Sequence, residues 1–345
     1  MKDREERLAD GLRVFTHTSD GFPRSPASDL QRRNSASSRG TPEAVAPKLG
    51  IQENFRMKIV QWMLDVLPPA LKSKPQLCIN LRAQLLESAD TRWHAAHMFT
   101  RYFLRVGVST TSPTPISEES RVKREEGGSS ERVLHGKEAL TWDLAVAAVA
   151  LAVKFHRDVL KPLYPVTARE FLLIAPHSIE YDDLEAAQRD LFSALSHCLG
   201  SNTPAAYIDE LWNALPSLRS LVTSRGNWEV TKFETWELLY DTLLDSSYLL
   251  YPVHVLTGCA VILGLIESLV MTMKADTAEK LRKLANGIGP RTKRREAACT
   301  CTKLQKKARK LVRNVELDMC ELLDVPGTLW TECMNWLEAV AEENY

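Results

Sequence analysis

The chain has 345 residues, of which 44% are hydrophobic and 26% charged, an ordinary composition for a globular protein that can bury a sizeable core. Its 44 basic and 44 acidic residues cancel, so the overall charge gives no reason to expect nucleic acid or an acidic partner, and any electrostatic function must be local. The seven cysteines are scattered and odd in number, which predicts free thiols in a reducing compartment.

Two stretches are rich in polar and turn-forming residues. Residues 1–50 contain TSDGFPRSPASDL and NSASSRGTPEAVAP, which cannot bury enough apolar surface to offset the entropy of ordering, so we expect a disordered tail. Residues 109–131, STTSPTPISEESRVKREEGGSSE, predict a polar insertion that is either functional or disordered. Four hydroxyl residues in these stretches precede a proline and are candidate phosphorylation sites: Ser25, Thr41, Ser112 and Thr114.

The remaining segments carry apolar residues at helical spacing, without a series of alternating strands, and predict an all-α fold. In the first part of the chain we expect helices at residues 55–67, 78–87, 91–104, 142–155 and 181–195. In the second part we expect them at residues 205–215, 228–244, 253–271, 279–286, 302–323 and 327–342.

Two of these helices are apolar on all sides, which is typical of a helix surrounded by others. Their apolar runs, Leu144–Val153 and Val255–Ile266, are shorter than the roughly 20 residues that a membrane-spanning helix needs, so we expect no membrane partner. Each helix follows an aromatic-rich amphipathic helix and precedes a charged one. This regularity predicts two similar helical units, because solenoid repeats would recur within about 50 residues.

The order of motifs along residues 50–270 resembles the cyclin family. ADTRWHAAHMFTRYF and AAVALAVKFHRD are similar to two successive helices of the N-terminal cyclin box, and YPVTAREFLLIAP and IEYDDLEAAQRDLFSALSHCLGSNTP follow in the family's order. DSSYLLYPVHVLTGCAVILGL, Asp245–Leu265, is similar to the second repeat, most of all in the transcription-associated cyclins. QWMLDV, Gln61–Val66, instead resembles the first helix of the cell-cycle cyclins.

The resemblance implies two tandem five-helix cyclin-box domains, at residues 51–200 and 201–290, with helices in 291–345 that complete or extend the second repeat. Two segments, residues 55–67 and residues 78–87, are alternatives for the first helix of the N-terminal box. The implied function is that of a regulatory subunit, not an enzyme, that binds a cyclin-dependent kinase catalytic subunit in transcription or cell-cycle control. We expect no cofactor, nucleic-acid partner or small-molecule ligand. The alternatives are a cyclin-fold adaptor that does not activate a kinase and an unrelated helical scaffold.

The resemblance also places a kinase-binding site at the end of the first apolar helix. In the family, an interface lysine and an interface glutamate bond the mobile regulatory helix of the kinase. Lys154 matches the lysine, Phe155 follows it, and the glutamate position falls on Gln188. A glutamine keeps a donor and an acceptor but loses the charge, which weakens the bond and leaves kinase activation open. The alternative for Lys154 is a snorkelling lysine at the end of a buried helix.

A docking patch like that of the cell-cycle cyclins is a further hypothesis. Their first helix has a pattern like M-R-A-I-L-x-D-W, and FRMKIVQW contributes a similar set: Phe55, Arg56, Ile59 and Trp62. Lys58 replaces an apolar residue, and Thr100 stands where the family has the aspartate that pairs with the arginine. The alternative is a helix that packs its apolar face on the core.

The stretch RTKRREAACTCTKLQKKARKLVR, Arg291–Arg313, holds ten basic residues and one acidic residue. Three interpretations stay open: a solvated helix face, a contact to nucleic acid, and a nuclear import signal. The import residues would be Lys293, Arg294, Arg295, Lys306 and Lys307. With an import signal we expect a nuclear location, and a cytoplasmic one is left open.

No enzyme motif is present: the sequence lacks a Walker loop, G-x-S-x-G, H-E-x-x-H and G-x-G-x-x-G. Cys299 and Cys301 are close, but no Cys-x-x-Cys pair or histidine cluster completes a zinc site, so we expect no metal. His94 and His97, three residues apart, are expected to be helix-surface or core histidines.

Overall fold

The computed structural model describes residues 49–65, 78–109, 137–157, 165–199, 203–284 and 293–344. Within these ranges the secondary structure consists of twelve α-helices and one 3₁₀-helix, without a strand, which confirms the all-α prediction. The predicted tail lies outside the described ranges except for residues 49–50, and the predicted insertion lies outside them except for Ser109.

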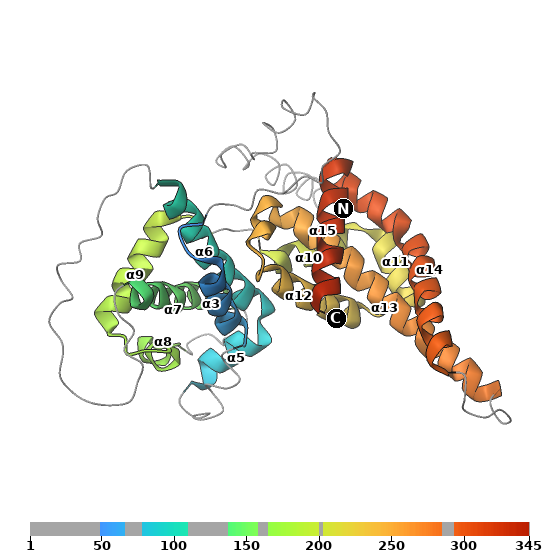
Figure 1. Cartoon of the computed structure of the whole chain (residues 1–345), viewed down its shortest axis with the longest axis horizontal. Coiled ribbons are helices and arrows are strands. Elements are labelled where there is room, and N and C mark those ends of the chain that lie inside the picture. The colour runs from blue at the N-terminus through green and yellow to red at the C-terminus, as the bar shows by residue number, and fades with distance from the viewer. Residues whose placement is uncertain are drawn as a thin grey trace, which may run out of the picture. The chain divides into compact units, whose positions relative to one another are not determined.

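The helices of residues 46–345 belong to one compact unit and follow each other in two groups (Figure 1). The first group contains α3 (Glu53–Asp65), α5 (Ile79–Glu87), α6 (Ala89–Ser109), α7 (Lys137–His156), α8 (Ala168–Ile174) and α9 (Tyr181–Ala194). The second contains α10 (Pro204–Ala214), α11 (Pro216–Arg225), α12 (Trp228–Thr242), the 3₁₀-helix η3 (Ser246–Leu250), α13 (Val253–Leu284), α14 (Lys293–Leu322) and α15 (Gly327–Asn344). The domain boundaries at 200 and 290 stay predictions.

Several helices begin at residues whose chemistry favours a helix start. α10 and α11 each begin with a proline, whose fixed φ suits the first helical position and whose missing N–H is not needed there. Asn227 caps α12, since its side chain accepts hydrogen bonds from the backbone N–H groups of Glu229 and Val230 at 3.0 and 3.4 Å. Thr167 and Glu170 form a capping box at the start of α8.

Two parts of the second group differ from the sequence prediction. The separate helix expected at residues 279–286 is wrong in the described part, because α13 continues without a break to Leu284. α11 was not expected, because only Leu218, Leu221 and Val222 in its PSLRSLVTSR sequence give an apolar pattern. Its start at Pro216 was a signal in the sequence that could have indicated it.

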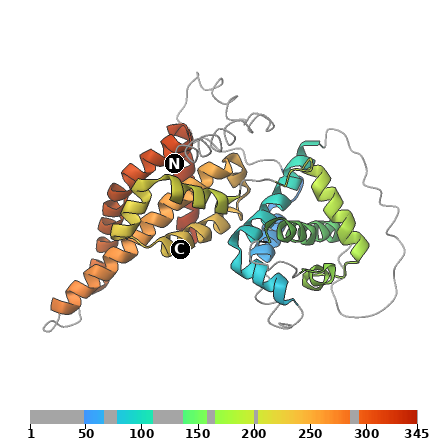
Figure 2. The same cartoon turned by 180° about the vertical axis from the view of Figure 1, so that it is seen from behind.

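Each of the two apolar helices is the centre of its own group. α7 packs against α3, α5, α6, α8 and α9, and both views show it between α9 and the α3–α6 pair (Figures 1 and 2). α13 packs against α10, α11, α12, α14 and α15. All side chains from Trp142 to Ala150 are buried, and all are hydrophobic except Asp143, whose carboxylate lies 2.8 Å from His177 Nε2. The predicted pair of buried helices is therefore present.

The same two helices are long and apolar enough, by length and composition, to cross a membrane: Lys137–His156 and the Val253–Thr277 part of α13. The shorter apolar runs counted in the sequence underestimated them, because both helices extend beyond their uninterrupted apolar stretches. In the described structure, however, 61% and 78% of the 18-residue apolar windows in these two segments are buried within the chain. Burial within the chain explains their composition without a membrane.

Gly264 lets α12 and α13 approach closely. A Cβ at this position would lie 2.6 Å from Thr235 Oγ1, 2.7 Å from the Thr231 carbonyl oxygen and 3.0 Å from the Thr235 backbone nitrogen. Since backbone atoms cannot move aside cheaply, we expect Gly264→Ala to lower the free energy of unfolding by about 2 kcal/mol, despite the better helix propensity of alanine.

The matched control is Gly258→Ala on the same helix. There a Cβ would meet only side-chain atoms of Leu323, Trp330 and Met319, at 3.0 to 3.2 Å. Small side-chain shifts and the propensity gain offset each other, so we expect a change below about 1 kcal/mol. Urea denaturation of both variants tests the comparison, and equal losses would contradict it.

Candidate protein-binding site at the end of helix α7

The last turn of α7 carries the chain from the core to the surface. Val153 is buried, whereas Lys154 is exposed and the Phe155 side chain is 44% exposed. The helix ends at His156 because Arg157 has a φ of 44°, the left-handed conformation that commonly terminates helices. A cation and an exposed aromatic ring therefore stand side by side at this helix end.

Lys154 and Gln188 lie in contact on the surface between α7 and α9. Lys154 Nζ donates a hydrogen bond to Gln188 Oε1 at 2.5 Å, although the two residues are 34 positions apart. The Gln188 amide is oriented by its Nε2, which donates to the Leu184 carbonyl oxygen at 3.3 Å. Since glutamine is neutral, this partner orients the ammonium group without neutralising its charge.

A buried histidine pair lies behind Phe155. The His94 ring is edge-on to Phe155, with centroids 5.1 Å apart, and its Nε2 lies 2.6 Å from the Leu199 carbonyl oxygen. A carbonyl only accepts, so Nε2 carries the proton and neutral His94 must accept at Nδ1. His156 Nε2 lies 3.0 Å from that Nδ1 and is the donor. His94 thereby fixes the position of the helix end.

His156 connects this pair to a buried carboxylate. Its Nδ1 lies 3.5 Å from Asp90 Oδ2, and Asp90 also accepts from the Thr203 hydroxyl group and, at 3.3 Å, from the Ala205 backbone N–H. The network therefore joins α6, α7, the segment after α9 and the start of α10.

Burial is the main cause that lowers the pKa of His94, to about 4, because a charged ring is poorly solvated there. The bond to the Leu199 carbonyl oxygen opposes this shift, while His156 and Arg101 add to it. Burial likewise lowers the pKa of His97, whose ring stacks on Trp93 and whose Nδ1 lies 3.1 Å from the Tyr248 hydroxyl oxygen. His94 is a core residue, one of the two expected alternatives, and His97 is half-buried beside the core.

The docking-patch hypothesis for α3 needs correction, because its residues face the core. Arg56 and Ile59 are fully buried, and the rings of Phe55 and Trp62 pack edge-on against Trp142 at 6.2 and 5.4 Å. An arginine or isoleucine that is covered by the chain cannot dock a substrate. The alternative, a helix packed on the core, describes α3.

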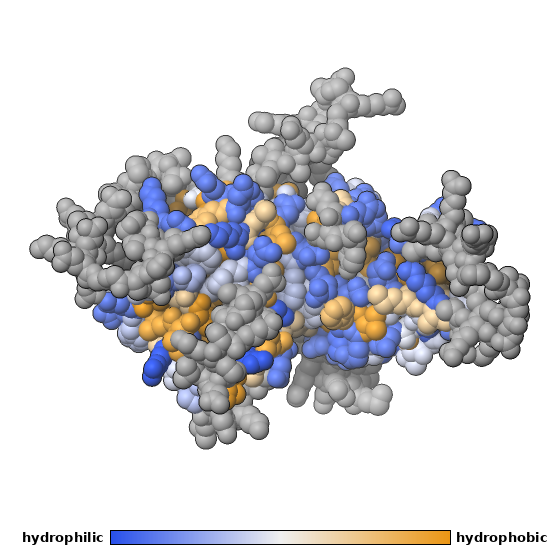
Figure 3. Space-filling model, turned by 60° about the horizontal axis from the view of Figure 1, so that its bottom comes forward, coloured by the Kyte–Doolittle hydropathy of each residue, from blue (hydrophilic) through white to orange (hydrophobic). Residues whose placement is uncertain are grey.

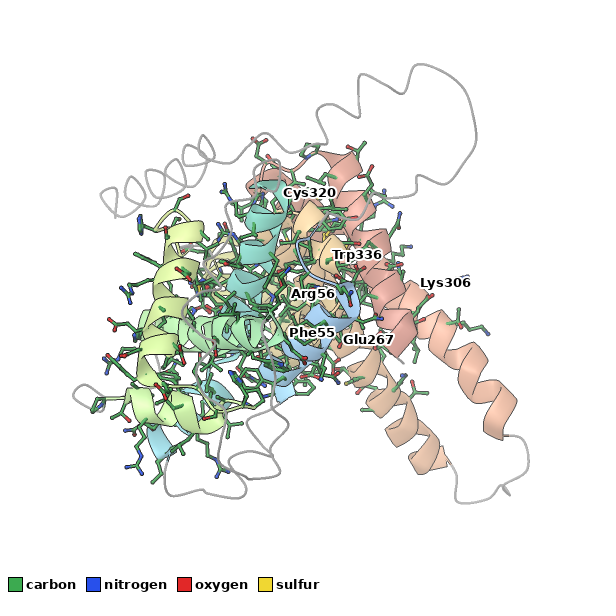
Figure 4. The ribbon with its side chains drawn as sticks, turned by 60° about the vertical axis from the view of Figure 1, so that its left-hand side comes forward. Phe55, Arg56, Glu267, Lys306, Cys320 and Trp336 are labelled. Carbon is green, nitrogen blue, oxygen red and sulfur yellow. The ribbon has the colours of Figure 1, made fainter. Side chains whose placement is uncertain are left out.

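Arg56 instead joins α3 to the end of α12. Its Nη1 donates to the Leu243 carbonyl oxygen at 2.7 Å and its Nη2 to the Leu244 carbonyl oxygen at 2.5 Å. Glu53 pairs with the same guanidinium at 2.6 Å (Figure 4 shows Arg56 beside Phe55 on α3). Thr100, which replaces the family's aspartate, is buried and donates to the Ala96 carbonyl oxygen at 2.9 Å.

The other predicted residues fall into two sets. Lys306 and Lys307 are exposed on α14, and Lys293, Arg294 and Arg295 belong to the first turn of that helix, where no side chain is described. The candidate phosphorylation sites lie outside the described residues: Ser25, Thr41, Ser112 and Thr114.

The end of α7 presents groups that are suited to binding. No group of three or more His, Cys, Asp or Glu side chains in these ranges is placed to hold a metal, and the described cysteines form no disulfide. At the α7 end, an ammonium group, an amide and an exposed ring can bond and cover a protein surface. Comparison of the chain with protein-family models and with curated protein sequences finds no match.

Proposed function

We propose that this protein is a cyclin-type regulatory subunit that binds and activates a cyclin-dependent protein kinase, in transcription or cell-cycle control. The binding face would be formed by Lys154, Phe155 and Gln188. Lys154 would donate to the regulatory helix of the kinase, and Phe155 would be covered by it. The chain would supply no chemistry of its own, since its role would be to hold the kinase in its active arrangement.

The observation that carries this proposal is the contact between Lys154 and Gln188. The resemblance selects these two positions from different helices as partners in one interface, without any information on distance. Lys154 Nζ and Gln188 Oε1 are 2.5 Å apart at an exposed edge. Lys154 and Gln188, which the resemblance assigns to one kinase interface, are therefore close enough for a single helix of the kinase to contact both.

The arrangement of the helices supports the finer proposal of two tandem cyclin-box domains. α7 and α13 are each surrounded by five other helices of the described chain. An unrelated helical scaffold would not be expected to contain two central helices, each surrounded by five others. In this proposal α14 and α15 complete the second repeat, because both pack on α13.

Exposed apolar side chains support a protein partner for the first group of helices. Seven of the ten large hydrophobic side chains that are exposed in the described residues belong to it: Met57, Ile79, Leu86, Leu140, Phe155, Leu173 and Tyr181. Figure 3 shows hydrophobic side chains gathered on the left part of the visible face, over this group. Exposed apolar side chains that form one contiguous patch are typical of surfaces that another protein covers.

A cyclin-fold adaptor that does not activate a kinase is the second candidate. The specific observation in its favour is Gln188, which gives Lys154 a neutral partner within the chain. A kinase helix would have to compete for the same ammonium group without the help of a carboxylate. The adaptor would keep the fold and lose the activation.

Affinity purification of the tagged full chain, with mass spectrometry and a kinase assay on the recovered material, tests the proposal. We expect a cyclin-dependent kinase catalytic subunit together with kinase activity that depends on the chain. A kinase without activation, or a transcription complex without a kinase, would favour the adaptor. Recovery of neither would contradict both candidates.

A further inference from the structure

The outer face of α14 concentrates positive charge in a protein whose net charge is zero. The inner face of this helix is buried through Ala308, Val312 and Val315. The opposite face exposes six cations, and no acidic residue occurs between residues 303 and 315: Lys303, Lys306, Lys307, Arg309, Lys310 and Arg313. Figure 4 shows Lys306 on the outer side of the helix.

Most of these cations lack a partner among the described residues. Arg309 Nη1 lies 2.8 Å from Glu338 Oε1, which neutralises one of them. The other five have no ion pair with any carboxylate of the described ranges. Five like charges on one face repel each other, so an anionic partner would relieve this repulsion.

The chemistry of the face selects among anionic partners. An interfacial membrane helix inserts its apolar face, but the apolar face of α14 is covered by α13. A protein interface needs aromatic or aliphatic anchors and is depleted in lysine, whereas this face exposes none from residue 302 to residue 314. Single-stranded nucleic acid is bound through aromatic stacking, which the same lack of rings excludes.

The remaining anionic partner is the phosphate backbone of a nucleic-acid duplex, and the spacing of its phosphates matches the length of the basic face. The ten steps from Lys303 to Arg313 rise about 15 Å along the helix axis. One strand of a duplex carries one phosphate per about 3.4 Å of axis, so this length spans about four to five phosphates. Five unpaired cations are thus matched to one strand.

We propose that the outer face of α14 binds the phosphate backbone of duplex nucleic acid, without reading its sequence. The surface is separate from the Lys154 site, and this inference does not depend on the proposed kinase partner. It takes up the nucleic-acid contact that the sequence leaves open for residues 291–313, against the expectation from the net charge.

The test is fluorescence anisotropy of the full chain with a labelled 20-base-pair duplex, as DNA and as RNA, between 50 and 200 mM salt. With about four to five phosphate contacts, the association constant should fall by two to three powers of ten over this range. The triple variant Lys303→Gln, Lys307→Gln, Lys310→Gln should bind more weakly and lose about three units of the logarithmic salt slope.

A matched variant controls for net charge. Lys58→Gln, Lys137→Gln, Lys274→Gln removes three exposed cations from α3, α7 and α13 and should keep the wild-type slope. Both triple variants should unfold at the wild-type temperature. The inference is overturned if no salt-dependent binding occurs, or if the two variants lose affinity equally. Tighter binding to phosphatidylserine vesicles or to polyglutamate than to the duplex would also overturn it.

Discussion

Replacing Arg56 by methionine should lower the free energy of unfolding by about 2–4 kcal/mol, because the backbone carbonyl groups that Arg56 bonds would lose their donor. Methionine cannot donate to the Leu243 and Leu244 carbonyl oxygens, which stay buried beside it. Glu53 would keep only the Ser246 backbone N–H, which now donates to it at 3.2 Å. Since these bonds join α3 to the end of α12, their loss should also loosen that contact.

Lys58→Met is the matched control for this prediction. It removes a cation from the same helix, two residues away, at an exposed position. We expect a change within about 0.5 kcal/mol, as for most surface substitutions. Urea denaturation at neutral pH measures both variants. If Arg56→Met were as stable as Lys58→Met, the described role of Arg56 would be wrong.

Acid should destabilise the protein through His94, by about 2 kcal/mol between pH 7.5 and pH 5. The pKa of His94 is lowered to about 4 in the folded protein, from an ordinary value of 6.5. Between these values the unfolded chain binds a proton that the folded protein does not, so stability rises with pH. The contribution of neutral His94 to the free energy of unfolding is therefore fully present above about pH 6.5 and is lost as the pH falls toward 4.

His94→Gln separates this effect from the rest of the molecule. A glutamine can still donate to the Leu199 carbonyl oxygen and accept from His156, but it does not titrate. Urea denaturation at pH 5 and pH 7.5 should show a smaller difference for the variant than for the wild type. Some pH dependence should remain, because burial also lowers the pKa values of His97 and His254. An unchanged difference would contradict the prediction.

The sequence predicted the core of the fold well, since burial leaves a direct pattern. α7 and α13 are apolar on every side because other helices surround them, and no partner needs to be known to see this. The starts of α10 at Pro204 and of α12 at Trp228 lie within one residue of the starts predicted at residues 205 and 228. α11 was missed because a short helix with few apolar residues leaves a weak pattern.

The polar contacts could not be predicted, because they depend on which segments meet. Arg56 lies 187 residues from Leu243, and nothing on α3 indicates that carbonyl oxygens at the end of α12 will face it. His94 and His156 are 62 positions apart, and no local pattern indicates that the two rings meet. Only the resemblance, which compares whole sites, assigns Lys154 and Gln188 to one site from the sequence.

The affinities of the Lys154→Glu and Lys137→Glu variants for the proposed partner, a kinase catalytic subunit, test the central claim most directly. Both changes exchange an exposed lysine on α7, and the two positions are separated by about 25 Å of helix. Affinity measured by calorimetry, with thermal unfolding as the check on folding, should show binding lost for Lys154→Glu and kept for Lys137→Glu. Wild-type affinity of a folded Lys154→Glu protein would contradict the assignment of this site.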